Sequence, residues 1–144
     1  MKIVIRQAQI DNCVAITKLT LELGYLVTEE NIKEWLDYLL KSENHMVLLA
    51  QDECGQTCGW IVMEKRISLE AGFKAEITGL VVGTEWRRLG IGKELVAAAE
   101  SWAIESGLSR IVVRSNIKRK ESHVFYNNIG FSLVKSAHNY EKQL

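Results

Sequence analysis

The residues best suited to binding chemistry lie in the stretch EWRRLGIGKEL, from Glu85 to Leu95. Apolar spacing predicts a helix from Ile91 to about Glu105, yet its start has two glycines, three cations and no capping side chain. A helix start leaves about four N–H groups unpaired and carries partial positive charge, so acids and Ser, Thr, Asp or Asn caps are usual there. We therefore expect an anion to bind the backbone N–H groups of this turn.

The relative magnitudes favour several N–H bonds as the main source of anion affinity. Charge-assisted hydrogen bonds contribute roughly 1.5–3 kcal/mol each, against about 0.3–1 kcal/mol for a charge near a helix end. The alternative is an exposed turn whose N–H groups bond only water. Asp11 and Thr28 each predict an ordinary cap for an earlier helix, so this chain supplies caps elsewhere.

The glycine spacing disfavours two common phosphate sites. It is not G-x-G-x-x-G, and no acid ends a following strand to bind a ribose, which argues against a dinucleotide fold. The pattern G-x-x-x-x-G-K-[ST] is also absent, which argues against a phosphate-transferring P-loop. A small nucleotide-binding protein stays open as an alternative, because it also predicts a ligand at this helix start.

The elements that position the turn follow from periodicity and glycine, since the chain has no proline. The expected order is β-α-α-β-β-β-α-β-α-β-β. Helices are expected at 11–23, 28–40, 91–105 and 120–129, and strands at KIVIRQA, HMVLLAQD, TCGWIVMEKR, KAEITGLVVG, RIVVRSN, FSLVKS and HNYEKQL.

This order predicts an α/β fold with a mixed central sheet and helices on both faces. A β-α-β unit spans 76–114, and its crossover should be right-handed. The glycine-rich turn then lies at the carboxyl end of a central strand. Open α/β sheets bind their ligands at that edge.

Composition limits the classes of partner. A chain of 144 residues that is 47% hydrophobic fits a single domain, 1–144, and its 18 basic and 18 acidic side chains make nucleic acid an unexpected partner. No signal peptide or membrane span is evident, so a cytoplasmic protein is expected. Cys13, Cys54 and Cys58 are interpreted as free thiols, although Cys54 and Cys58 could pair across a hairpin. No metal site is expected, because no His cluster accompanies the cysteines.

The motifs together resemble the GNAT superfamily of acyl-CoA-dependent N-acetyltransferases. Arg87, Gly90 and Gly92 match the pattern Q/R-x-x-G-x-G/A. AEITGLVV before the turn, and RSN and HVFYNNIGF after it, occur in the order and approximate spacing of that family. The expected element order is similar to the family fold across essentially the whole chain.

The resemblance implies acetyl-CoA as the co-substrate and assigns its contacts. Backbone groups of the strand at Leu80, Val81 and Val82 would bind the pantetheine arm, which lies between splayed parallel strands like an added strand. Asn116 would bond the pantetheine or the next helix, with a plain turn asparagine as the alternative. The pyrophosphate site would comprise Arg87, Arg88, Leu89, Gly90, Ile91, Gly92 and Lys93.

The resemblance also suggests two catalytic residues. Glu76 stands where some family members carry a catalytic glutamate, and an amine nucleophile that arrives protonated needs such a base. The alternatives for Glu76 are a solvated strand residue or an ion-pair partner. Alternation places Glu76, Thr78 and Leu80 on one face, but Gly79 could mark a bulge that changes this count. Relatives that act on aminoalkylphosphonates carry a second acid at the position of Gly79.

Tyr126 in HVFYNNIGF matches the family tyrosine that protonates the CoA thiolate, with a packing tyrosine as the alternative. No cysteine stands at the expected thioester, so direct attack by a primary amine of a small molecule or peptide is expected. Its site should be formed by the first two helices, their connection at 24–28 and the loop at 69–73. A non-catalytic acyl-CoA-binding module is the alternative function, and a homodimer stays open.

Overall fold

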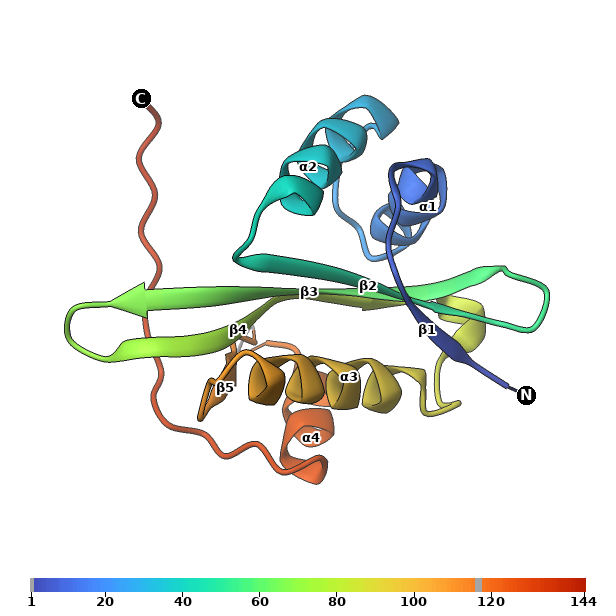
Figure 1. Ribbon diagram of the computed structural model, residues 1–144. Helices are drawn as coiled ribbons and strands as arrows, with labels where there is room; N and C mark the ends of the chain where they lie inside the picture. Colours follow the sequence, from blue (N-terminus) through green and yellow to red (C-terminus); the bar gives the residue numbers. More distant parts are fainter. Residues whose placement is uncertain (1, 116–117) are drawn as a thin grey trace. The chain divides into compact units, whose positions relative to one another are not determined.

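The protein is described here by a computed structural model that covers residues 2–115 and 118–144 (Figure 1). Five strands form one sheet in the order β1-β2-β3-β4-β5, and all neighbours are antiparallel except β4 and β5, which are parallel. The strands are β1 (Val4–Gln7), β2 (His45–Gln51), β3 (Thr57–Ser68), β4 (Gly72–Val82) and β5 (Ile111–Val113). The mixed sheet expected from the sequence is therefore confirmed.

Helices cover both faces of this sheet, as expected. Figure 1 shows α1 (Cys13–Glu22) and α2 (Glu29–Lys41) on one face and α3 (Ile91–Glu105) on the other. The core beneath α1 and α2 contains Ala8, Cys13, Ile16, Leu36, Val47, Leu49 and Val62. On the α3 side, Ala75 packs with Ala103 and Leu108. Each helix buries one apolar stripe against the sheet, which explains the periodicity of the sequence.

The helix caps agree with the sequence prediction at one helix and not at the other. The Thr28 hydroxyl accepts a hydrogen bond from the Asn31 N–H at 3.0 Å, so this cap of α2 is confirmed. The Asp11 cap is wrong. Asp11 lies inside a 3-10 turn (Ile10–Asn12) that precedes α1, and the Asn12 side chain accepts from the Gln9 N–H at 2.7 Å instead.

The chain forms two compact units, Met1–Arg114 and Ser115–Leu144. The second contains α4 (Lys120–Asn128), which the sequence predicted. The strands expected at FSLVKS and HNYEKQL are wrong, because residues 131–144 form neither helix nor strand. Alternation supplies propensity only, and a strand needs a ladder partner. Leu133 and Val134 are accordingly 84% and 88% exposed.

Candidate active site

The turn before α3 has the unpaired N–H groups expected from the sequence. A 3-10 turn (Thr84–Trp86) follows β4, and Gly90, with φ of +80°, then forms the N-cap position without a capping side chain. The first helical bond runs from the Glu94 N–H to the Gly90 carbonyl at 3.1 Å. Within the described ranges, nothing accepts a hydrogen bond from the N–H groups of residues 88–93.

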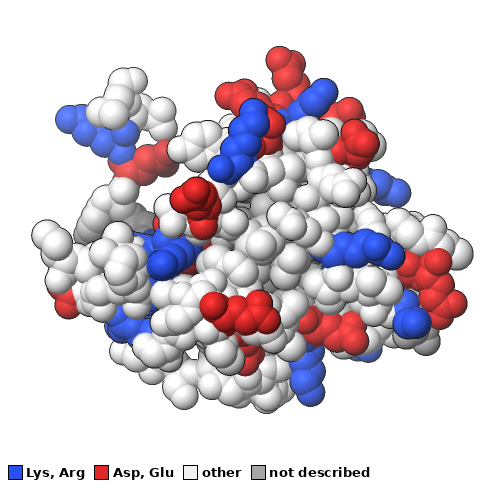
Figure 2. Space-filling model, in the orientation of Figure 1, with Lys and Arg blue, Asp and Glu red and all other residues white. Residues whose placement is uncertain are grey.

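The same turn is open to an anion. Arg87, Arg88, Leu89, Gly90 and Lys93 are exposed, whereas Ile91 is buried and fixes the helix against the sheet. A Cβ added at Gly90 would meet no atom within 4 Å, so the space beside the N–H groups is free. Figure 2 shows basic and acidic side chains interspersed over the face drawn. The turn itself carries three exposed cations, Arg87, Arg88 and Lys93. Free N–H donors and local positive charge fit a phosphate group.

Strands β4 and β5 separate close to this turn. Residues Ala75–Ile77 of β4 pair with Ile111–Val113 of β5, whereas β4 continues to Val82. Residues 79–82 pair with β3 on one edge and have no β5 partner among the described residues on the other. Leu80, Val81 and Val82, the predicted pantetheine contacts, all lie in this open part of β4. An extended ligand can add to such an edge as a further strand would.

A β-bulge changes which side chains of β4 lie on the same face of the sheet. Val62 pairs with Gly79 and Met63 pairs with Ile77, so Thr78 is the extra residue and the bulge expected near Gly79 is present. Glu76 stands opposite Glu64, and Val81 stands opposite Trp60. Since residues 60, 62 and 64 alternate regularly in β3, Val81 and not Leu80 shares the face of Glu76.

The side of the bulge that faces α1 is filled by the indole of Trp60. A Cβ added at Gly79 would lie 2.6 Å from a carbon of this ring, which no real contact allows. The Trp60 Nε1–H also donates to the Thr20 hydroxyl of α1 at 3.2 Å, which fixes the ring in place. An acidic side chain at position 79 therefore has no room in this fold.

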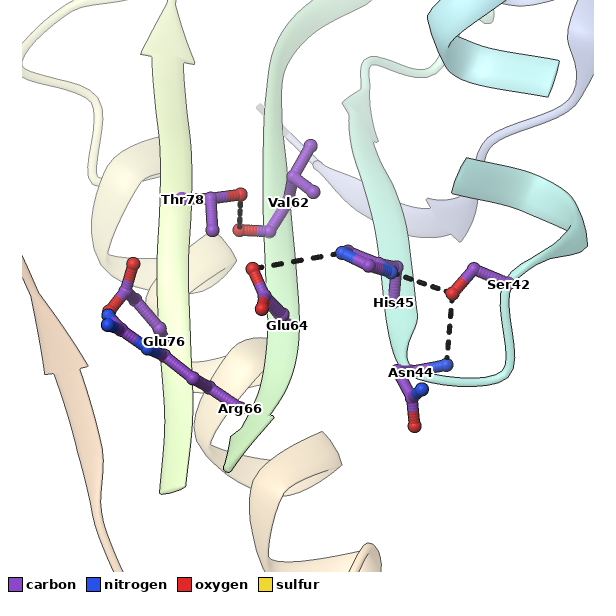
Figure 3. A network of polar contacts seen from close by, with 8 residues as sticks. All are labelled: Ser42, Asn44, His45, Val62, Glu64, Arg66, Glu76 and Thr78. Carbon is purple, nitrogen blue, oxygen red and sulfur yellow. Dashed lines mark hydrogen bonds and ion pairs between the residues drawn. The ribbon is translucent and has the colours of Figure 1, made fainter. Parts of the chain in front are cut away.

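Glu76 lies where the two parallel strands separate, one residue before the last paired position. Its side chain is 12% exposed, and its Oε1 accepts a bond from Nη1 of Arg66 at 2.8 Å (Figure 3). The ion-pair alternative left open by the sequence is therefore present in the structure. The other carboxylate oxygen has no partner in the described part of the chain, so the ion pair leaves one oxygen able to accept a proton. The role of Glu76 as a base stays a prediction.

Four residues of the polar network around Glu76 were missed by sequence reasoning. Arg66 binds Glu76, Nε2 of His45 lies 3.8 Å from Oε2 of Glu64, and Nδ1 of His45 contacts the Ser42 hydroxyl at 2.7 Å (Figure 3). Alternation along TCGWIVMEKR could have placed Glu64 and Arg66 on one face. Their proximity to Glu76 depends on strand register, which one sequence does not reveal.

Tyr126 belongs to the second unit. It packs edge-on against Phe125 and Phe131, with ring centroids 5.2 and 5.6 Å away. Burial raises the pKa of Tyr126 above its ordinary value of 10.0, and the opposing effect of Arg119 is smaller. The phenol is thus protonated at neutral pH and able to donate a proton. Asn116, the other site residue predicted nearby, lies outside the described residues.

Other features of the described residues add no site. No group of three or more His, Cys, Asp or Glu side chains among them could hold a metal ion. None of their helices combines the length and apolar character that a membrane crossing requires. Cys13, Cys54 and Cys58 are free thiols.

A mixed sheet whose parallel strands part beside a helix start with unpaired N–H groups defines an α/β protein suited to an extended, phosphate-bearing co-substrate. A sequence model of the acetyltransferase (GNAT) family matches residues 14–131. The chain belongs to this family and is an acetyl-CoA-dependent N-acetyltransferase.

Individual relatives differ in the acceptor that their names give. An uncharacterized N-acetyltransferase of Bacillus subtilis, YhdJ, is 30% identical over 117 residues, which cover 77% of this chain and 80% of the relative. The aminoalkylphosphonate N-acetyltransferase of Salmonella typhimurium is 31% identical over 118 residues, covering 74% and 75%. The structure of AAC(6')-Iy with a bisubstrate analogue, CoA-S-monomethyl-acetylneamine, has a TM-score of 0.89 at 17% identity and covers both chains fully.

Proposed function

We propose that this enzyme transfers acetyl directly to a primary amine of a small cationic molecule or a peptide, with Glu76 as the base. The observation that carries this proposal is the open edge of β4. It connects the unpaired N–H groups at α3 with the point of strand separation at Glu76. Residues 78–82 extend over about 16 Å at a rise of roughly 3.3 Å per residue, so an arm bound along them would reach from the turn to Glu76.

The reaction needs two proton transfers. An alkylamine with a pKa near 10 is only about 0.1% neutral at pH 7, a deficit of roughly 4 kcal/mol. The neutral amine would attack the thioester carbonyl, Glu76 would take a proton from its nitrogen as the N–C bond forms, and the C–S bond would then break to release CoA thiolate. The family resemblance assigns the thiolate proton to Tyr126, whose pKa is raised by burial. No covalent enzyme intermediate is needed.

The acceptor is proposed from the relatives and the bulge together. Relatives act on aminoalkylphosphonates and on aminoglycosides. Aminoalkylphosphonate enzymes are expected to carry an acid at position 79, where Trp60 leaves no room in this protein. We therefore favour an acceptor without a phosphonate, such as an amino sugar or polyamine. The homodimer and the cytoplasmic location stay predictions.

Purified protein, acetyl-CoA and a panel of amino sugars, polyamines, aminoalkylphosphonates and peptides test the proposal. Acetylated product should form with at least one amine, and Glu76→Gln should lower kcat by about 100-fold or more. Thermal shifts with CoA, ATP and NAD check the co-substrate, because only CoA should stabilise the fold strongly. CoA binding without turnover on any amine would instead support the acyl-CoA-binding module.

A further inference from the structure

The ion pair of Arg66 and Glu76 sits in an unusual part of the β3–β4 ladder. Glu76 stands directly opposite Glu64, and Arg66 stands directly opposite Lys74. Two like-charged pairs thus follow one another on the same face of the same two strands. Like charges directly opposite each other destabilise a sheet. A ladder selected for stability alone would place an acid opposite a base at both positions.

The contact between Arg66 and Glu76 runs diagonally across this ladder. Its 2.8 Å length and the 12% exposure of the Glu76 side chain make it a defined contact. Arg66 is nevertheless 37% exposed, and ion pairs exposed to this degree contribute about 0–1 kcal/mol to folding. The pair therefore adds little stability beyond offsetting the repulsion around it.

The hydrogen bond from Arg66 makes the two carboxylate oxygens of Glu76 different. Oε1 is held by Arg66, whereas Oε2 has no hydrogen-bond partner in the part of the chain that the structure describes. Oε2 also reaches solvent. Among the described residues, Ser115 Oγ is the only side-chain polar atom that is both buried and without a partner, so the unpartnered Oε2 is not buried. One oxygen is fixed and the other is accessible, which suits a group that must receive a proton from a bound molecule.

We propose that Arg66 is a positioning residue for acetyl transfer, holding Oε1 of Glu76 so that Oε2 faces the acceptor amine. The proposal rests on the function of Glu76 as the base. As the amine N–C bond forms, the amine proton passes to Oε2, and the carboxylate becomes a carboxylic acid. Arg66 keeps its charge throughout, because a guanidinium does not release its proton near neutral pH.

Kinetics of Arg66→Met, Arg66→Lys and Lys74→Met test this role. A misplaced catalytic group can cost up to about 100-fold, so Arg66→Met should lower kcat between roughly 10- and 100-fold. The KM for acetyl-CoA and the affinity for CoA should stay unchanged, because Arg66 pairs with Lys74 near one end of β4 and the proposed phosphate-binding turn follows the other end. Arg66→Lys should recover part of kcat. Lys74→Met removes a cation from the same ladder position and should change kcat by less than about twofold.

A double-mutant cycle separates positioning from a structural role. If Arg66 acts through Glu76, Arg66→Met should lower kcat no further in the Glu76→Gln background. An equal loss in both backgrounds, or a loss that merely follows a lowered Tm, would overturn the inference. Should Arg66→Met not fold, Arg66→Lys serves in the same cycle.

The outcome for Glu76 is distinguishable from the outcome for Arg66. If Glu76→Gln is inactive while Arg66→Met keeps full kcat, the positioning role is wrong and the proposed base stands. If Glu76→Gln keeps full kcat, the base assignment fails and the role of Arg66 fails with it.

Discussion

Gly90 allows the anion-binding turn to be tested by charge alone. Its φ of +80° is a conformation that Asn and Asp tolerate better than other side chains, and a Cβ there meets nothing within 4 Å. Both residues are also favoured N-caps. Gly90→Asp and Gly90→Asn should therefore both fold, and they differ in one negative charge.

The size of the charge effect follows from Coulomb's law. A carboxylate roughly 5 Å from a phosphate charge is repelled by about 0.8 kcal/mol at the dielectric constant of water and by about 3 kcal/mol at an effective value near 20. Because about 1.4 kcal/mol corresponds to a factor of ten, Gly90→Asp should bind CoA between roughly 4- and 250-fold more weakly than Gly90→Asn. Added salt should reduce the difference.

Isothermal titration with CoA measures this difference directly, and urea unfolding of both variants verifies the fold. Either side chain can accept a bond from the N–H groups of the first turn, so Gly90→Asn accounts for competition with the ligand. Equal CoA affinity for the two variants, at low salt and with equal stability, would refute the placement of phosphate at this turn.

Three further predictions concern packing and protonation. Gly79→Ala should lower the free energy of unfolding by about 1–3 kcal/mol, because its Cβ meets the Trp60 ring. Adding Trp60→Leu to this variant should relieve part of that loss. Urea unfolding that shows no loss in Gly79→Ala would contradict this contact. Burial raises the pKa of Tyr126 above 10.0, so the stability it supplies is complete below that pH and is lost as pH rises through the folded-state pKa. Unfolding free energies at about pH 9 and about pH 11 should thus fall less in Tyr126→Phe than in the native chain. Burial raises the pKa of Cys58 to about 11, so near pH 8 a thiol reagent should modify the exposed Cys54 and spare Cys58; rapid modification in Cys54→Ser would be inconsistent with this.

Much of the fold was predictable because local periodicity and tertiary packing agree. The helices at α2 and α3, the central hairpin and the Thr28 cap all follow from short-range patterns. The bulge near Gly79 was also anticipated, since a glycine inside a strand often marks one. The N–H groups left unpaired before α3 follow from the lack of a cap in EWRRLGIGKEL.

The errors arose where local patterns do not determine partners. The Asp11 cap failed because the chain enters α1 through a 3-10 turn that contains Asp11, and the Asn12 side chain accepts from the Gln9 N–H before that turn. The strands expected after Gly130 failed because alternation cannot supply a ladder neighbour. Arg66 and Glu64 were missed because only the register of β3 with β4 brings them to Glu76.

The indole of Trp60, held by Thr20 and lying over Gly79, constrains how this enzyme can diverge. A single substitution that introduces an acid at position 79 should be strongly destabilising, because the aromatic ring already fills the space of its side chain. A smaller residue at position 60 would make that space, at the cost of packing between α1 and the sheet. A change of acceptor that depends on that acid therefore couples positions 60 and 79, and either mutation alone is destabilising.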